Sequence, residues 1–176
     1  MYKEGKLSAF GDNHLISTSQ LEGVLTFNPD RPELSNIVLS VPTQSLIVND
    51  PTLRAKAEEG FNSKVSYFNR KVTRKSMLGK NVLHAEKHPY IQLESLKLPT
   101  KLTGKAILEV TLRDTAREEA VDIKTQFGSD VFHISGQFYL KQSDYGIAPF
   151  SIMFGSIRVK DELRLDFDVH AMCPVL

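Results

Sequence analysis

The chain of 176 residues lacks features on which several classes of protein depend. It has no tryptophan and one cysteine, Cys173, which cannot form an internal disulfide and so leaves both a reducing cytoplasm and a periplasm open. No run approaches the roughly 18 apolar residues of a membrane-spanning helix. Lys plus Arg number 22 and Asp plus Glu 21, for a net charge of +1. This near-neutrality gives no overall attraction to nucleic acid, which is not an expected partner.

Catalytic signatures are also missing. The sequence contains no G-x-S-x-G, no phosphate-binding glycine loop, no paired cysteine ligands and no His-Glu-x-x-His. We therefore expect a binding protein with no catalytic residues, no resident metal and no cofactor. The rival hypothesis is a small lipid hydrolase or isomerase that uses His84, His88 or Asp144 at the mouth of the fold.

Length and composition predict one domain over residues 1–176, because 41% hydrophobic and 24% charged residues are ordinary for a globular protein. Residues 1–6 carry charge, but no apolar run follows them, so no signal peptide is visible in this chain. The expected compartment is the periplasm if a leader has been removed, and the cytoplasm otherwise.

The dominant pattern is an alternation of apolar and polar residues, which is typical of strands with one buried face. It is clearest from Glu162 to Ala171, where Leu163, Leu165 and Phe167 alternate with charged residues. The eight strands expected from this pattern are 7–10, 21–27, 37–41, 91–98, 104–112, 121–127, 132–140 and 162–171.

Short breakers separate most of these strands, among them 28–32, 98–100, 113–115 and 128–130. Connections of this length join antiparallel neighbours. Eight antiparallel strands with one wet face must pack on a second sheet or curl. We expect a mainly β fold: a closed eight-stranded antiparallel β-barrel with a short helical insertion.

The insertion covers about residues 50–83, where the alternation stops. Asp50 is a suitable helix cap, and Pro51 suits the first helical position. A second helix is expected after Ser63, with Val65, Phe68 and Val72 on one side and Gly79 at its end.

His84 and His88 have the H-x-x-x-H spacing of a helical metal site. Pro89, however, disfavours a helical conformation at His88. Residues 90–94 then alternate as a strand does. We therefore interpret 82–95 as a hinge between a helix and a strand.

The size of the inward residues decides whether a small barrel is filled or encloses a ligand. Large apolar residues share these faces with Gly23, Gly104 and Gly136, which indicates either a vacant apolar tunnel or glycines that relieve bending strain. We place the entrance near the helical segment and the loop 146–155. The candidate tunnel-lining residues are Phe27, Leu39, Phe68, Leu78, Leu83, Ile91, Leu93, Leu108, Val110, Phe132, Ile134, Phe138, Phe150, Met153, Leu165 and Phe167.

Residues 61–85 contain six basic side chains and no acidic one. On a helical wheel Arg70, Lys71 and Arg74 lie opposite Val65, Phe68 and Val72. The hypothesis is that Arg70, Lys71, Arg74 and Lys75 dock on an anionic membrane surface, each cation contributing about 1 kcal/mol. The alternative is an ordinary solvated helix face.

Three blocks of the sequence resemble the YceI-like polyisoprenoid-binding family. "TRKSMLGKNVLHAEKHPYIQLES" matches its signature at Thr73, Arg74, Met77, Leu78, Val82, Leu83, Ala85, Pro89, Ile91 and Ser95. Residues 21–48 resemble its early block, and 143–169 its ending with Tyr145-Gly146-Ile147. His84 stands where the family commonly has Asp.

The resemblance implies a lipocalin-like barrel whose tunnel holds a long isoprenoid chain, such as a quinone tail. The expected function is therefore non-enzymatic binding, storage or transport of such a lipid, with the bound isoprenoid as ligand. A packed barrel that serves only as an interaction module stays as a third hypothesis. A homodimer, through outer patches such as Val24 and Val38, is also left open.

Overall fold

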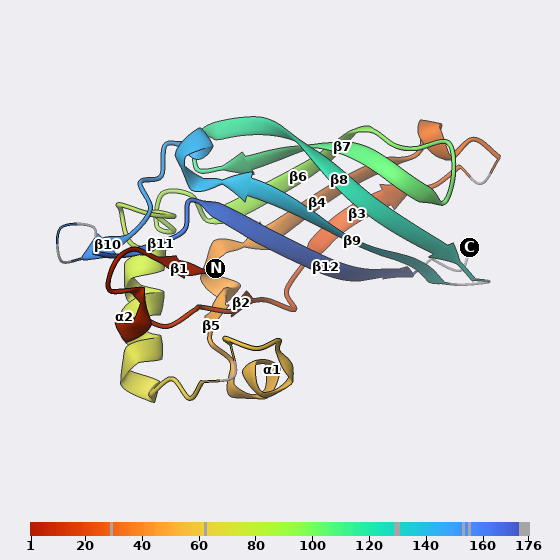
Figure 1. Ribbon diagram of the computed structural model, residues 1–176. Coiled ribbons are helices and arrows are strands. Elements are labelled where there is room, and N and C mark those ends of the chain that lie inside the picture. Colours follow the sequence, from red (N-terminus) through yellow and green to blue (C-terminus); the bar gives the residue numbers. More distant parts are fainter. Residues whose placement is uncertain (29, 62, 129–130, 153, 155, 173–176) are drawn as a thin grey trace.

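The computed structural model describes residues 1–176 except 29, 62, 129–130, 153, 155 and 173–176. Its main element is a seven-stranded antiparallel sheet that curls into a half-barrel (Figure 1). The order from edge to edge is β12-β9-β8-β7-β6-β4-β3. The strands are β3 (Glu22–Thr26), β4 (Asn36–Pro42), β6 (Tyr90–Lys97), β7 (Thr103–Leu112), β8 (Thr115–Phe127), β9 (Val131–Lys141) and β12 (Glu162–Met172).

Smaller elements gather toward one end of the half-barrel, on the left in Figure 1. They include two small sheets and the helices α1 (Pro51–Lys56) and α2 (Tyr67–Leu78). The short strands are β1 (Lys3–Glu4), β2 (Ile16–Ser17), β5 (Ile47–Val48), β10 (Ser151–Ile152) and β11 (Ile157–Val159). The 3-10 helices at this end are η1 (Ser8–Phe10), η3 (Thr43–Ser45) and η4 (Gln142–Tyr145), whereas η2 (Pro32–Leu34) lies at the opposite end.

The alternation in the sequence determines which residues form the core. On β7, Ala106, Leu108 and Val110 are buried on the concave face, and residues between them point outward. The same period continues on β8 with Val121 and on β9 with Phe138. One hydrophobic cluster therefore fills the concave side, and the convex side faces solvent.

The sheet is not the closed eight-stranded barrel expected from the sequence. Its two edges, β3 and β12, do not pair with each other in the described part of the chain. Seven of the eight expected strands are present, and the missing one is residues 7–10. There the chain forms η1, with the Ser8 N–H donating to the Gly5 carbonyl at 3.1 Å and the Gly11 N–H to the Ser8 carbonyl at 3.0 Å.

A β-bulge between Ser95 and Lys97 reverses the alternation in β6. Ile91 and Leu93 point inward, and simple continuation would bring Lys97 inward as well. The bulge instead turns Lys97 out and brings Leu98 into the core with 7% of its surface exposed. Ser95 supports this site because its hydroxyl accepts from the Ile37 N–H and donates to Asn36 Oδ1, both at 2.9 Å.

Two inward glycines allow close approach of neighbouring groups and leave no empty space. Gly136 pairs with Phe167 across β9 and β12. A Cβ atom at Gly136 would lie 2.6 Å from Phe167 Cζ and 2.3 Å from the Asp122 carbonyl oxygen. At Gly23, a Cβ would lie 2.2 Å from the Val38 carbonyl oxygen and 2.7 Å from Leu39 Cδ2. The side chains of Phe167 and Leu39 thus occupy the volume that the glycines leave.

The helices begin where capping residues occur. Asp50 caps α1, accepting hydrogen bonds from the Thr52 and Leu53 N–H groups, as expected. Ser66 caps α2 by accepting from the Asn69 N–H, and Gly79 follows its last residue. No described helix is long and apolar enough to span a membrane.

The segment from His84 to Pro89 is a turn between α2 and β6, so His84 and His88 do not share a helix. His84 has a φ of +47°, and its carbonyl accepts from the His88 N–H at 2.9 Å. Thr43 fixes the segment, donating from its hydroxyl to the His88 carbonyl and from its N–H to the Pro89 carbonyl, both at 2.8 Å. The helix ends before Gly79, as expected, and the chain turns into the strand β6 after Pro89.

Candidate functional site

The concave face holds an apolar cavity, which we call the inner pocket. Its cavity volume is about 30 Å³, and no polar surface lines it. It lies between the middle of the sheet and the edge strand β12. The lining residues are Ile37, Leu39, Leu98, Ala106, Leu108, Ile123, Ile134, Phe167 and Val169.

A second cavity, the outer pocket, adjoins the inner one. The two share Ile37, Leu98, Ile123 and Ile134. The outer pocket has a volume of about 20 Å³, and its remaining lining residues are Leu25, Phe27, Pro32, Ser35, Pro99, Lys101, Leu102, Thr125 and Phe132. It is more open than the inner pocket, so it provides the mouth of the pair.

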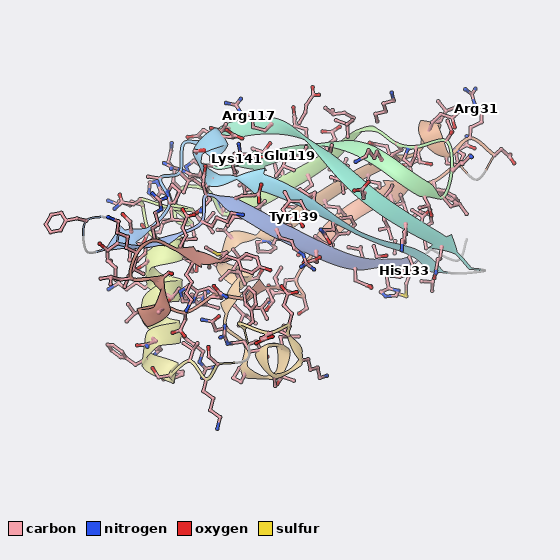
Figure 2. All side chains as sticks on the ribbon, in the orientation of Figure 1. Arg31, Arg117, Glu119, His133, Tyr139 and Lys141 are labelled. Atoms are coloured by element: carbon pink, nitrogen blue, oxygen red, sulfur yellow. The ribbon has the colours of Figure 1, made fainter. Side chains whose placement is uncertain are left out.

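The mouth lies at the end of the half-barrel away from α1 and α2. Its rim comes from the chain around η2 and from residues 99–102 between β6 and β7. Figure 2 shows Arg31, next to η2, and His133 at this end, whereas Arg117 and Lys141 lie at the other. The pockets therefore do not open near the helical segment and the loop 146–155, where the sequence led us to place the entrance.

Polar groups at the mouth are few. Lys101 is the one titratable side chain among the residues that line the two pockets. The Thr125 hydroxyl is held by the Leu102 carbonyl, to which it donates at 2.7 Å. Ser35 accepts from the Asn28 N–H at 3.0 Å. The exposed Lys101 ammonium is thus the charged group available to a ligand at this rim.

The free volume is far smaller than a long hydrocarbon chain requires. About 10–15 Å³ of cavity volume accommodates one water molecule, so neither pocket holds more than about three waters. The expected vacant slot is absent from the described residues because Phe167 and Leu39 cover the glycine positions. A larger ligand can enter only if the side chains along the edge strands move outward.

The movable wall of the pockets is the one formed by the edges of the sheet. Leu25 and Phe27 at the β3 edge, and Phe167 and Val169 on β12, are half-buried, whereas Ala106 and Ile123 in the middle are buried. The Phe27 and Phe132 rings contact each other with centroids 4.7 Å apart. An edge side chain has fewer neighbours to hold its rotamer, so displacing it costs less than displacing a central one.

The structure places the tunnel-lining candidates in three groups. Phe27, Leu39, Leu108, Phe132, Ile134 and Phe167 line the pockets. Leu83, Ile91, Leu93, Val110, Phe138 and Leu165 belong to the surrounding core without lining a pocket. Phe68, Leu78 and Phe150 lie elsewhere, with Phe68 and Phe150 exposed, and Met153 lies outside the described residues.

Several pocket residues are missing from that set of candidates. Ile37, Ala106 and Val169 share the alternation of candidate residues on their own strands, and Ile123 shares that of β8, so all four could have been found by following the pattern consistently. Leu98 could not, because the bulge after Ser95 changes the phase of the strand.

The proposed catalytic histidines do not approach the pockets. His88 is 8% exposed, and its Nδ1 lies 3.4 Å from Asp114 Oδ1 in the turn between β7 and β8. The His84 ring packs against that of His88 with centroids 5.6 Å apart. Lys87 Nζ donates to Asp114 Oδ2 at 2.8 Å, and this bond lowers the pKa of the Asp114 carboxyl. These contacts join the turn before β6 to the sheet.

Asp144 lies in η4, at the end opposite the mouth. Its carbonyl accepts from Arg117 Nε at 3.1 Å. The adjacent Tyr145 is 1% exposed and donates its hydroxyl to Glu119 Oε1 at 2.8 Å. Burial and this hydrogen bond to a carboxylate raise the pKa of Tyr145, so its hydroxyl stays protonated. The Tyr145-Gly146-Ile147 block therefore anchors η4 on the sheet.

The helix α2 is rotated relative to the amphipathic arrangement expected from the sequence. Arg74 faces the body of the protein, with Nε donating to the Leu46 carbonyl at 2.9 Å and Nη2 to the Gln44 carbonyl. Arg70 Nε is also buried. Of the four proposed docking cations, Arg74 is thus turned inward and Arg70 is half-buried. Phe68 and Val72 face solvent instead, 73% and 49% exposed, beside Lys71 and Lys75.

The sequence profile of the YceI-like domain matches residues 8–171. The chain belongs to the YceI-like domain family. This family is associated with lipid and isoprenoid binding. The resemblance seen in the sequence blocks is therefore confirmed, and with it the expectation of a curled antiparallel sheet.

Solved structures share the fold at low sequence identity. The YceI protein of Campylobacter jejuni has a TM-score of 0.67 at 14% identity, covering 93% of this chain and 87% of that one. Burkholderia cenocepacia BcnA has a TM-score of 0.65 at 12% identity, covering 89% and 86%. A mutant of the Campylobacter protein with a monobromobimane guest has a TM-score of 0.68 at 14% identity, covering 93% and 87%. No curated protein sequence matches this YceI-like chain.

Proposed function

We propose that this YceI-like protein binds the hydrocarbon chain of a lipid, such as an isoprenoid, in its half-barrel and performs no chemistry on it. The observation that carries the proposal is the pair of adjoining apolar pockets on the concave face. They share four residues, Ile37, Leu98, Ile123 and Ile134, and lead from the middle of the sheet to one mouth. Membership of the YceI-like family supports a lipid as the ligand.

Burial of apolar surface supplies the driving force. A chain that buries about 400 Å² gains about 10 kcal/mol at about 25 cal/mol/Å², before the cost of association. Part of this gain is spent on moving the edge side chains, because the unliganded pockets are nearly filled. Lys101 at the mouth favours a ligand whose polar end carries an anionic or hydrogen-bond-accepting group.

The test compares the same substitution on the two faces of the sheet. Val169→Phe adds a ring inside the inner pocket, whereas Val38→Phe adds one on the exposed face of β4. With geranylgeraniol as the probe, we expect Val169→Phe to weaken binding at least tenfold and Val38→Phe to leave it unchanged. Because the chain has no tryptophan, intrinsic tryptophan fluorescence cannot report binding. Calorimetry and native mass spectrometry provide the readout.

Equal binding of geranylgeraniol by both variants, or no binding by the unmodified chain, would contradict the assignment of the two pockets as the binding site. Unfolding in urea checks that Val169→Phe still folds. Native mass spectrometry of the protein as purified further shows whether a prenyl lipid is retained.

We also propose that the outer face of α2, defined by Phe68, Lys71, Val72 and Lys75, rests on an anionic membrane surface. Tyr67, 65% exposed, extends this face at the start of the helix. The Lys71 ammonium lies 5.0 Å from the centroid of the Tyr67 ring, which places charge and aromatic surface together. The complementary partner of an apolar helix face flanked by lysines is an anionic lipid headgroup layer.

This docking is independent of the pocket mouth, which lies at the other end of the half-barrel (Figure 1). Lys71→Gln with Lys75→Gln removes about 2 kcal/mol of attraction, roughly a 30-fold loss of vesicle binding. Co-sedimentation with an equimolar mixture of phosphatidylcholine and phosphatidylglycerol measures it. Lys124→Gln on the exposed face of β8 is the matched control. Equal binding to neutral vesicles, or none to either kind, would end the proposal.

A further inference from the structure

Two histidines and an aspartate meet on the convex face of the sheet, away from both pockets. His133 on β9 is the direct cross-strand partner of His170 on β12. Asp168 lies two residues before His170, so it projects from the same face of β12. Among the described residues, these three form the one group whose ligand atoms all lie within 4.8 Å of one another.

The distances suit a metal ion. His133 Nε2 lies 3.0 Å from Asp168 Oδ1, and His170 Nε2 lies 3.1 Å from the same oxygen. Two ligands bound at about 2.0–2.1 Å to a tetrahedral zinc ion lie about 3.3 Å apart. The two nitrogen–oxygen separations are already close to this value, and the imidazoles must rotate out of their parallel stacking for both nitrogens to point at one ion.

The backbone holds the three groups in place without a ligand. The imidazole rings stack with centroids 4.5 Å apart and an interplanar angle of 11°. Both strands continue on either side of the cluster in an unbroken antiparallel register from Glu162 to Met172. His133 is 24% exposed in its side chain, and Asp168 and His170 are 63% exposed. The site is therefore pre-formed on one side and open to solvent on the other.

We propose that His133, Asp168 and His170 bind a divalent transition metal ion of the zinc class on the outer surface of β9 and β12. Two imidazole nitrogens and one carboxylate oxygen match the preference of Zn²⁺ for nitrogen and oxygen ligands. Water fills the remaining coordination position. Hard cations such as Mg²⁺ and Ca²⁺ prefer all-oxygen sites and are not bound here.

The metal joins the edge strand to the sheet. In the described part of the chain, β12 has β9 as its single neighbour in this sheet. Phe167 and Val169 alternate with Asp168 and His170, so the inner face of the same stretch lines the inner pocket. A bound ion would fix the strand that forms the movable wall. Binding selectively to the folded state also raises stability by mass action.

The experiment is a calorimetric titration of the untagged full chain with Zn²⁺ alone. We expect one ion per chain and at least tenfold weaker binding in His133→Gln, Asp168→Asn and His170→Gln. The matched control is His84→Gln, which removes a histidine from the other close pair and leaves the affinity unchanged. Circular dichroism confirms that each variant is folded.

A second readout locates the ion. Hydrogen exchange of residues 162–172 slows on adding Zn²⁺, and exchange of 103–112 in the middle of the sheet does not change. Co²⁺ in place of Zn²⁺ gives visible absorption bands that the double variant His133→Gln/His170→Gln lacks. The proposal is overturned if the chain takes up no stoichiometric Zn²⁺, if the double variant binds as tightly, or if His84→Gln abolishes binding.

Discussion

The central strands and the edge strands of the half-barrel carry the same alternating pattern but differ in burial. On β7 and β8 the inward residues Val110 and Val121 are 2% and 0% exposed. On β12 the inward residues Leu165, Phe167 and Val169 are half-buried. Burial is therefore set by neighbours on both sides of a strand, and an edge strand has a neighbour on one side only. The edges provide the less buried wall of the pockets, and the centre provides the fully buried one.

The largest expected difference between the two regions comes from replacing one phenylalanine in each with alanine. Phe138 is 4% exposed, so Phe138→Ala should cost about 3–5 kcal/mol of unfolding free energy. Phe167→Ala on β12 should cost about half as much, because its ring is half-buried and the neighbours can collapse onto Gly136. Urea unfolding measures both values. Equal losses would show that the edge is packed as firmly as the centre.

Gly136→Ala tests the contact between the centre and the edge. The added methyl group would lie 2.3 Å from the Asp122 carbonyl oxygen and 2.6 Å from Phe167 Cζ. We expect a loss of about 1–3 kcal/mol as β8 and β12 shift to relieve the overlap. Gly128→Ala is the control, since its Cβ would meet the Val131 carbonyl at 3.5 Å, an ordinary contact. Thermal unfolding of the two variants gives the difference, and similar melting temperatures would refute the close approach.

The pH dependence of stability tests the contribution of Asp161, which lies where the edge strand begins. Asp161, just before β12, accepts from the Ser143 hydroxyl at 2.6 Å and from the Ser143 N–H at 2.9 Å, which lowers its pKa. The folded state thus has the lower pKa, so the stabilisation is present above the unfolded pKa of about 4 and is lost as the pH falls through the folded value.

Asp161→Asn should flatten this acid dependence slightly, the smallest of the three effects because the carboxylate is partly exposed to solvent. Urea midpoints between neutral and acidic pH provide the measurement, with Asp30→Asn in the β3–β4 loop as the control. If the fall of the urea midpoint at acidic pH is the same in Asp161→Asn as in the unmodified chain, the hydrogen bonds between Asp161 and Ser143 do not stabilise the start of the edge strand.

Much of the fold was predictable because alternation reports directly on the buried face. Seven of the eight expected strands exist, and the capping role of Asp50 follows from its residue type. Closure was not predictable, because no local pattern states whether β3 and β12 reach each other. The N-terminal segment was misassigned: Gly5 has a positive φ, the chain turns after it, and residues 8–10 form a 3-10 helix.

The candidate site was predictable in its chemistry and not in its volume. The alternation located an apolar interior, but only coordinates show that Phe167 covers Gly136 and that Leu39 fills the space beside Gly23. The orientation of α2 was also beyond the sequence. The hydrogen bonds from Arg74 to the carbonyls of residues 44 and 46 turn this side chain inward, and a helical wheel carries no information on such partners.

The gap between β3 and β12 has a mechanical consequence for the half-barrel. A closed barrel can widen only if hydrogen bonds between neighbouring strands break. A half-barrel whose two edge strands are not paired can widen by bending, and its inter-strand hydrogen bonds stay intact. For the proposed binding of a hydrocarbon chain, the size of the ligand would then be governed by the bending stiffness of seven strands rather than by the volume enclosed in the unliganded state.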